Sequence, residues 1–92
     1  MIHELKLLPQ YYNDVALGIK TFELRKNDRD FQVGDELVLR EWDGEDYTGR
    51  SLFRHVVYIY HGCNCYGLEE GYCILGMKMS PIPNATLDNK GG

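Results

Sequence analysis

One short stretch, GIKTFELR at residues 18–25, marks a change in the periodicity of the chain. From residue 21 on, apolar Phe22 and Leu24 alternate with polar Glu23 and Arg25, which is the two-residue period of a strand. Gly18 stands just before that strand, and glycine accepts the left-handed backbone conformation that often ends a helix. The stretch therefore predicts a helix that stops at residue 17 and a strand, with one apolar and one polar face, that begins at residue 21.

Upstream of this stretch the sequence predicts one strand and one short helix. Residues 2–8 alternate between two faces, which is typical of a strand. Pro9 then ends the strand, and proline is well tolerated in the first turn of a helix. Apolar residues recur at helical spacing up to residue 17, so we expect a helix over residues 9–17.

Downstream, strand-like runs alternate with turn signals. A polar segment at 26–30 and a turn at 31–35 lead into a predicted strand over residues 36–42. The run DGED at 43–46 indicates a hairpin-type turn. Two more strands are predicted at 51–60 and 72–79, separated by a glycine-rich segment. We therefore expect a mainly β (α+β) domain over residues 1–79, a small barrel of about five strands with one or two flanking helices, followed by a disordered tail at 80–92.

Charge is spread unevenly along the 92 residues. The formal net charge is −4, which argues against indiscriminate coating of duplex DNA. Residues 20–29 nevertheless carry four cationic and two acidic side chains, a net of +2, which leaves −6 for the rest of the chain. A basic strip on an acidic body is typical of a selective anion or nucleotide site, although ordinary surface ion pairs would give the same pattern.

Several features bear on location and on cofactors. No segment has the apolar length of a membrane span, and residues 1–8 do not resemble a secretory leader. The three cysteines are an odd number, as expected for reduced thiols in a cytoplasmic protein. His61, Cys63 and Cys65 are three possible metal ligands within five positions, but a structural zinc site usually has two well-spaced pairs of ligands, so no metal or other cofactor is predicted.

The motif G-x-K-x-x-E-x-R at residues 18–25 resembles the signature of ASCH domains, a branch of the PUA-like superfamily. The runs KNDRDF at 26–31, VGD at 33–35 and GYCILG at 71–76 are similar to one bacterial and phage-associated branch of unassigned function. This resemblance covers about residues 2–79. It implies a PUA-like β-barrel with a helix beside a cleft that binds RNA or nucleotides.

The resemblance assigns this cleft to a small set of side chains. Lys20, Glu23 and Arg25 would line the site, with Lys26, Asn27 and Arg29 near its rim. Strict alternation would place Lys20 on the face opposite to Glu23 and Arg25. We therefore expect residue 20 to belong to the turn before the strand, where it can join them.

Two other functions remain open from the sequence. Some small ASCH proteins are amidohydrolases that remove the acetyl group from acetylated cytidine, with a lysine, a threonine three residues later and a distant glutamate. Lys20 fits this pattern, but the third position on is Glu23, so Lys20 and Glu23 would have to be the reacting pair. Glu69 or Glu70 are candidates for the distant glutamate. The second alternative is a protein-interaction accessory domain.

Overall fold

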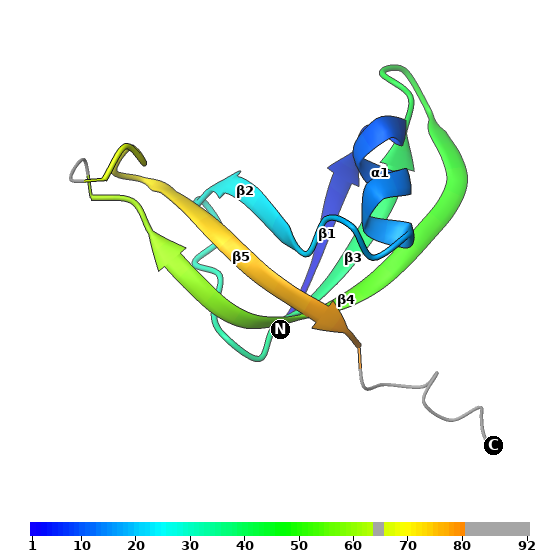
Figure 1. Cartoon of the computed structure of the whole chain (residues 1–92). Coiled ribbons are helices and arrows are strands. Elements are labelled where there is room, and N and C mark those ends of the chain that lie inside the picture. Colours follow the sequence, from blue (N-terminus) through cyan, green and yellow to red (C-terminus); the bar gives the residue numbers. More distant parts are fainter. Residues whose placement is uncertain (64–65, 81–92) are drawn as a thin grey trace, which may run out of the picture.

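The computed structural model describes residues 1–63 and 66–80, and it has one helix and five strands (Figure 1). The elements follow in the order β1 (Ile2–Leu7), α1 (Pro9–Ala16), β2 (Phe22–Lys26), β3 (Glu36–Trp42), β4 (Tyr47–His61) and β5 (Tyr72–Met79). The predicted mainly β class with about five strands is confirmed, with a single helix beside the sheet. From residue 81 on, the predicted tail lies outside the described residues.

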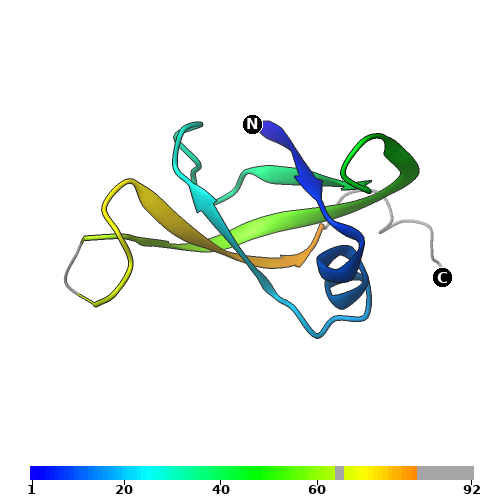
Figure 2. The ribbon, with the colours of Figure 1, turned by 90° about the horizontal axis from the view of Figure 1, so that it is seen from above.

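All five strands form one sheet in the order β1-β3-β4-β5-β2. β1 pairs with β3 in parallel, and the other three neighbouring pairs are antiparallel. The sheet curls strongly, so that β1 and β2, at opposite ends of the strand order, come to lie on the same side of the molecule (Figures 1 and 2). The result is a half-barrel that is open between β1 and β2.

Arginine side chains from the β2 side bridge this opening. Arg25 Nη2 donates to the carbonyl of Lys6 at 2.7 Å, and Arg29 Nη1 donates to the carbonyl of Glu4 at 2.6 Å. Among the described residues no backbone ladder joins β1 to β2. Guanidinium groups therefore satisfy the β1 carbonyls that a neighbouring strand would otherwise bond.

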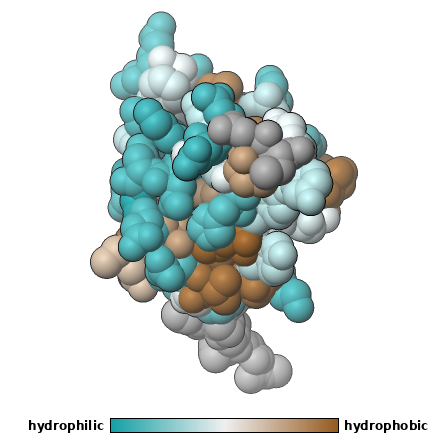
Figure 3. Space-filling model, turned by 90° about the vertical axis from the view of Figure 1, so that its left-hand side faces the viewer, coloured by the Kyte–Doolittle hydropathy of each residue, from teal (hydrophilic) through white to brown (hydrophobic). Residues whose placement is uncertain are grey.

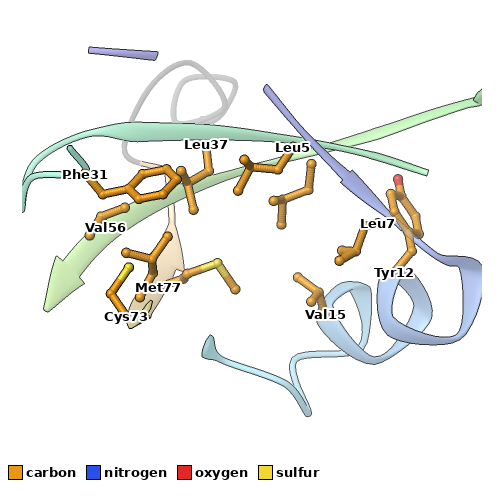
Figure 4. Packing of buried hydrophobic residues seen from close by; sticks show 11 residues of the cluster. Leu5, Leu7, Tyr12, Val15, Phe31, Leu37, Val56, Cys73 and Met77 are labelled. Atoms are coloured by element: carbon orange, nitrogen blue, oxygen red, sulfur yellow. The ribbon is translucent and has the colours of Figure 1, made fainter. Parts of the chain in front are cut away.

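The hydrophobic core fills the concave side of the sheet, with α1 packed at one end of it (Figure 4). On β1 the alternation predicted from the sequence is confirmed, because His3, Leu5 and Leu7 are buried. Tyr12 and Val15 are the buried residues of α1. The other core members are Phe31, Leu37, Leu39, Val56, Cys73, Leu75 and Met77. The end of the molecule seen in Figure 3 is mostly hydrophilic, with hydrophobic side chains gathered low on that face.

Helix α1 ends as the sequence predicts, and its end sets the position of the next segment. Gly18 has a φ of 78°, the left-handed conformation that glycine accepts without strain. The chain then turns so that the amides of Ile19 and Lys20 both donate to the carbonyl of Asp14, at 2.9 and 3.0 Å. Residue 20 is therefore held against the last turn of the helix before β2 begins.

Strand β4 is longer than predicted and begins at Tyr47 instead of residue 51. The carboxylate of Glu41 on β3 explains the extension. It accepts hydrogen bonds from Thr48 Oγ1 at 2.6 Å and from Arg50 Nε and Nη2, both at 2.8 Å. These contacts hold residues 47–50 beside β3, although the sequence pattern predicts that the strand begins only at residue 51. The side-chain hydrogen bonds from Arg50 and Thr48 lower the pKa of Glu41 to about 2.

No helix within residues 1–63 and 66–80 is long and apolar enough to cross a membrane.

Candidate functional site

The carboxylate of Glu23 lies at the centre of a cluster with Lys20 and Arg25. Its side chain is only 3% exposed, against 17% for Lys20 and 25% for Arg25. Lys20 Nζ donates to Glu23 Oε1, and Arg25 Nε donates to Glu23 Oε2 at 3.0 Å. The three side chains predicted to form the site are therefore brought together, and residue 20 precedes β2 as expected.

The polar face of β2 points into the half-barrel. Glu23 and Arg25 lie opposite Leu75 and Cys73 of β5, which are both fully buried. The apolar side chains Phe22 and Leu24 are instead 47% and 55% exposed. Alternation along a strand separates two faces but does not say which is buried, and the pairing with β5 decides it here. The cost of burying the Glu23 carboxylate on this side is offset, because Lys20 and Arg25 supply two positive charges and donate hydrogen bonds to it.

Lys20 is fixed from several directions. Its amide is bonded to α1 through Asp14, as described above, and its Nζ also donates to the carbonyl of Phe22 at 2.8 Å. The ammonium group lies 5.7 Å from the centre of the Tyr11 ring and 5.2 Å from that of Phe22. Both distances are within the range of a cation–π interaction. The charge is therefore held between α1 and β2.

A cleft of about 480 Å³ opens beside this cluster, between the end of β1, the start of α1 and β2. Its lining combines an apolar wall with four cationic side chains and one carboxylate. The lining residues are Lys6, Leu7, Leu8, Tyr11, Lys20, Phe22, Glu23, Leu24, Arg25 and Lys26. The formal charge of the lining is therefore +3, on a chain whose net charge is −4.

Lys6 is the cationic lining residue that the sequence analysis missed. It lies on β1, far from the motif in the sequence, and its ammonium is 4.5 Å from the centre of the Trp42 ring. The alternation of residues 2–8 places Lys6 on the polar face of its strand, but nothing in the sequence indicates that this strand borders β2. Only the curl of the sheet brings Lys6 to the cleft.

The three residues predicted for the rim have different positions. Lys26 lines the cleft, and in the described part of the chain its side chain makes no hydrogen bond or ion pair. Asn27 Oδ1 accepts a hydrogen bond from the amide of Phe31 at 3.2 Å, which stabilises the turn after β2. Arg29 donates to the carbonyl of Glu4 and so helps to bridge the opening between the β2 side and β1. Asn27 and Arg29 are not among the residues that line the cleft.

Strand β2 also offers main-chain groups to the cleft. Thr21 accepts from the amide of Met77 at 2.9 Å and Asn27 donates to Gly71 at 2.8 Å, so odd-numbered residues bond toward β5. Alternate residues of an edge strand direct their N–H and C=O away from the partner. Leu24 therefore presents one donor and one acceptor, side by side, on the edge of β2 that borders the cleft.

Other groups named in the sequence analysis lie elsewhere. Glu69 and Glu70 follow β4 and come just before Tyr72, which pairs with Lys26 at the far end of β2 from Lys20. The two ends of β2, Phe22 and Lys26, are four residue steps apart, about 13 Å at 3.3 Å per step. Their position at the opposite end of β2 from Lys20 does not favour either glutamate as the distant glutamate, and that assignment stays a prediction. Cys65 lies outside the described residues, and within those described no group of three or more His, Cys, Asp or Glu side chains could hold a metal ion.

Two comparisons relate this chain to known proteins. The sequence model of one family, described as a domain of unknown function (DUF3850), matches residues 2–77. An "uncharacterized 12.9 kDa protein in GpA 3′region" of Escherichia phage P2 is 45% identical to the chain over 51 residues. That alignment covers 55% of this chain and 47% of the phage protein, so the match spans about half the length of this curated relative. Neither comparison names the ASCH domain, and that assignment stays a prediction.

Proposed function

This chain belongs to the DUF3850 family, and from that premise we propose that it is a binding module for a nucleotide, free or within single-stranded RNA. The site would be the cleft beside Glu23. The observation that carries the proposal is the lining of that cleft, which has four cationic side chains and one carboxylate on an otherwise acidic protein. Such a concentration of positive charge attracts a phosphate.

Each part of a nucleotide has a matching part of the cleft. Lys26 makes no side-chain hydrogen bond or ion pair within the described residues, so it is available to a phosphate at the rim. Tyr11 and the exposed ring of Phe22 offer surfaces on which a base can stack. The main-chain N–H and C=O of Leu24 match the adjacent acceptor and donor on the edge of a base. A volume of about 480 Å³ is also within the range of small-ligand sites.

The Lys20–Glu23 pair also supports a second candidate function, hydrolysis of a nucleoside amide such as acetylated cytidine. In that reaction water adds to the acetyl carbon, the C–N bond breaks, and cytidine and acetate leave. Glu23 would take the proton from the water and pass it to the nitrogen of the departing cytidine. Each oxygen of Glu23 already accepts a hydrogen bond from a cationic side chain, so a water activated there would share an oxygen with Lys20 or Arg25. Binding without turnover is therefore the first proposal.

A thermal-shift screen at low salt tests both candidates. The purified chain is mixed with nucleosides, nucleoside monophosphates, acetylated cytidine and short single-stranded RNA. A ligand that binds only the folded protein raises its melting temperature, and low salt preserves the electrostatic contribution. We expect at least one phosphate-bearing compound to shift the wild-type protein. Acetylated cytidine is then incubated with the protein and followed for release of acetate, which would support the hydrolase.

Two matched variants connect any shift to the cleft. Lys26→Gln removes a cation from the rim, and Arg40→Gln removes a cation from β3, outside the cleft lining. Both change the net charge equally, so general electrostatic attraction falls by the same amount in each. We expect Lys26→Gln to weaken nucleotide binding more than Arg40→Gln. No shift with any compound, or equal loss in the two variants, would reject the proposal and leave a protein-interaction domain as the better hypothesis.

A further inference from the structure

A second cavity, of about 310 Å³, lies on the other side of Lys20 from the cleft. It is bordered by the end of α1, residues 20 and 21, Arg54 of β4 and the last residues of β5. Lys20 is the residue that its lining shares with the cleft. The two spaces are therefore neighbours separated by the short segment between α1 and β2.

The charge of this second cavity is entirely positive. Lys20, Arg54 and Lys78 line it, and its lining includes no carboxylate. Arg54 donates to two neutral acceptors, the carbonyls of Phe53 at 2.8 Å and Val15 at 3.1 Å, so its position is fixed while its charge is not neutralised. Lys78 is exposed, and within residues 1–63 and 66–80 it makes no side-chain hydrogen bond or ion pair. Arg54 and Lys78 can therefore receive an anion without first breaking an ion pair, whereas Lys20 is already paired with Glu23.

The segment between α1 and β2, which separates the cavity from the cleft, is fixed at both ends by main-chain hydrogen bonds. The amide of Lys20 is bonded to Asp14 of α1, and the carbonyl of Thr21 is bonded to the amide of Met77 on β5. Two binding spaces on either side of such a segment keep a fixed separation. A ligand built of repeating units, each with one base and one phosphate, can therefore occupy the cleft and the cavity at the same time.

The cavity also has apolar walls. Val15 and Met77 form buried parts of its lining, and the side chains of Leu17 and Met79 are mostly exposed at its edge. A second phosphate alone needs only the cations, whereas a second nucleoside also uses apolar surface. This combination favours a neighbouring nucleotide of a strand over the extra phosphates of a nucleoside triphosphate.

We infer that this second cavity is a subsite for the neighbouring nucleotide of a single-stranded oligonucleotide, whose phosphodiester would lie between Lys20, Arg54 and Lys78. This inference rests on the proposed function, since the first nucleotide would occupy the cleft. The inference identifies the ligand as an oligonucleotide, and a mononucleotide would fill only one of the two subsites.

The test is calorimetric titration of the full chain with a mononucleotide, the corresponding triphosphate, and single-stranded RNA of two, four and six nucleotides. We compare the wild-type protein with Lys78→Gln, Met79→Glu and the charge-matched control Arg40→Gln. Lys78 and Met79 are exposed, so both changes leave the core intact. Wild-type protein is expected to bind the dinucleotide more tightly than the mononucleotide and the triphosphate.

The variants give a quantitative signature. Lys78→Gln is expected to weaken RNA binding by roughly 1.5- to 5-fold, the effect of one partly exposed ion pair. The slope of log affinity against log salt concentration should also fall by about 0.7, the value for one phosphate contact on a single strand. Met79→Glu adds a negative charge beside the subsite and should weaken RNA binding as well. Neither variant should change mononucleotide binding more than Arg40→Gln does.

Three results would overturn the inference while leaving the proposed function intact. In the first, the dinucleotide binds no more tightly than the mononucleotide, although mononucleotide binding is weakened by Lys26→Gln. In the second, the triphosphate gains as much affinity as the dinucleotide, which would make the cavity a polyphosphate site. In the third, Lys78→Gln and Arg40→Gln weaken RNA binding equally. Absence of binding by every compound would instead reject the proposed function itself.

Discussion

Replacing Glu23 by glutamine removes one buried charge and keeps the size of the side chain. Wild-type Glu23 is 3% exposed and accepts hydrogen bonds from Lys20 and Arg25. Breaking a fully buried ion pair costs about 3–5 kcal/mol of unfolding free energy, because a charge is left unpaired. Lys20 and Arg25 are 17% and 25% exposed, so each can regain some hydration after the change. We therefore expect a smaller loss, about 2–3 kcal/mol.

Urea unfolding followed by circular dichroism measures this loss. The midpoint should fall while the slope m stays constant, since the surface exposed on unfolding is the same. In a thermal scan, a loss of this size corresponds to about 10–20 °C for a domain of this length. The control is Glu4→Gln, because Glu4 is 63% exposed and its nearest contact with Arg40 is 3.4 Å. That change should cost no more than about 0.5 kcal/mol.

Equal losses in the two variants would refute the reasoning, because they would mean that the buried carboxylate does not hold the edge of β2 in place. Ligand binding adds an independent check on the same protein. Glu23→Gln removes the single carboxylate from the lining of the cleft, so affinity for a phosphate should be retained or rise, provided that the variant is kept at a temperature where it is folded. Under the hydrolase alternative the same substitution abolishes turnover.

Three further predictions follow from other contacts. The pKa of Glu41 in the folded protein is about 2, against an ordinary value of 4.5, so its contribution to stability is complete above pH 4.5 and is lost as the pH falls toward 2. Stability measured by urea unfolding should therefore fall less over this interval in Glu41→Gln than in the wild type; parallel curves would contradict this. Arg29→Gln removes the hydrogen bond to the Glu4 carbonyl and should lower the free energy of unfolding by about 0.5–1.5 kcal/mol, with faster amide hydrogen exchange in β1. Unchanged exchange would show that the position of β1 does not depend on Arg29. Gly18→Ala should cost about 1–2 kcal/mol from its φ of 78° alone, since an added Cβ meets no atom within 4 Å, and unaltered thermal stability would contradict that strain.

Local sequence patterns were sufficient to locate most secondary structure in this protein. The ends of β3 and β5 agree with the predicted residues 36–42 and 72–79, and β1 and α1 differ from their predictions by one residue each. These elements have clear alternation, a proline at a helix start or a glycine at a helix end, which act over a few residues. The first residues of β4 lack such a pattern. They form a strand because Thr48 and Arg50 bond Glu41 on β3, and a contact with another strand leaves no mark on local periodicity.

The sequence alone determined that Lys20, Glu23 and Arg25 belong together, because their spacing across a helix end and a strand matches a recurring motif. Only the tertiary structure decided that their face of β2 points inward, since alternation separates two faces without orienting either. The curl of the sheet also decided that Lys6 borders the same cleft and that Arg29 reaches across the opening of the half-barrel to β1. The contacts of Arg25 and Arg29 with β1 join residues 19 and 25 positions apart, and they arise from the order of strands in the sheet, which a two-residue period cannot specify.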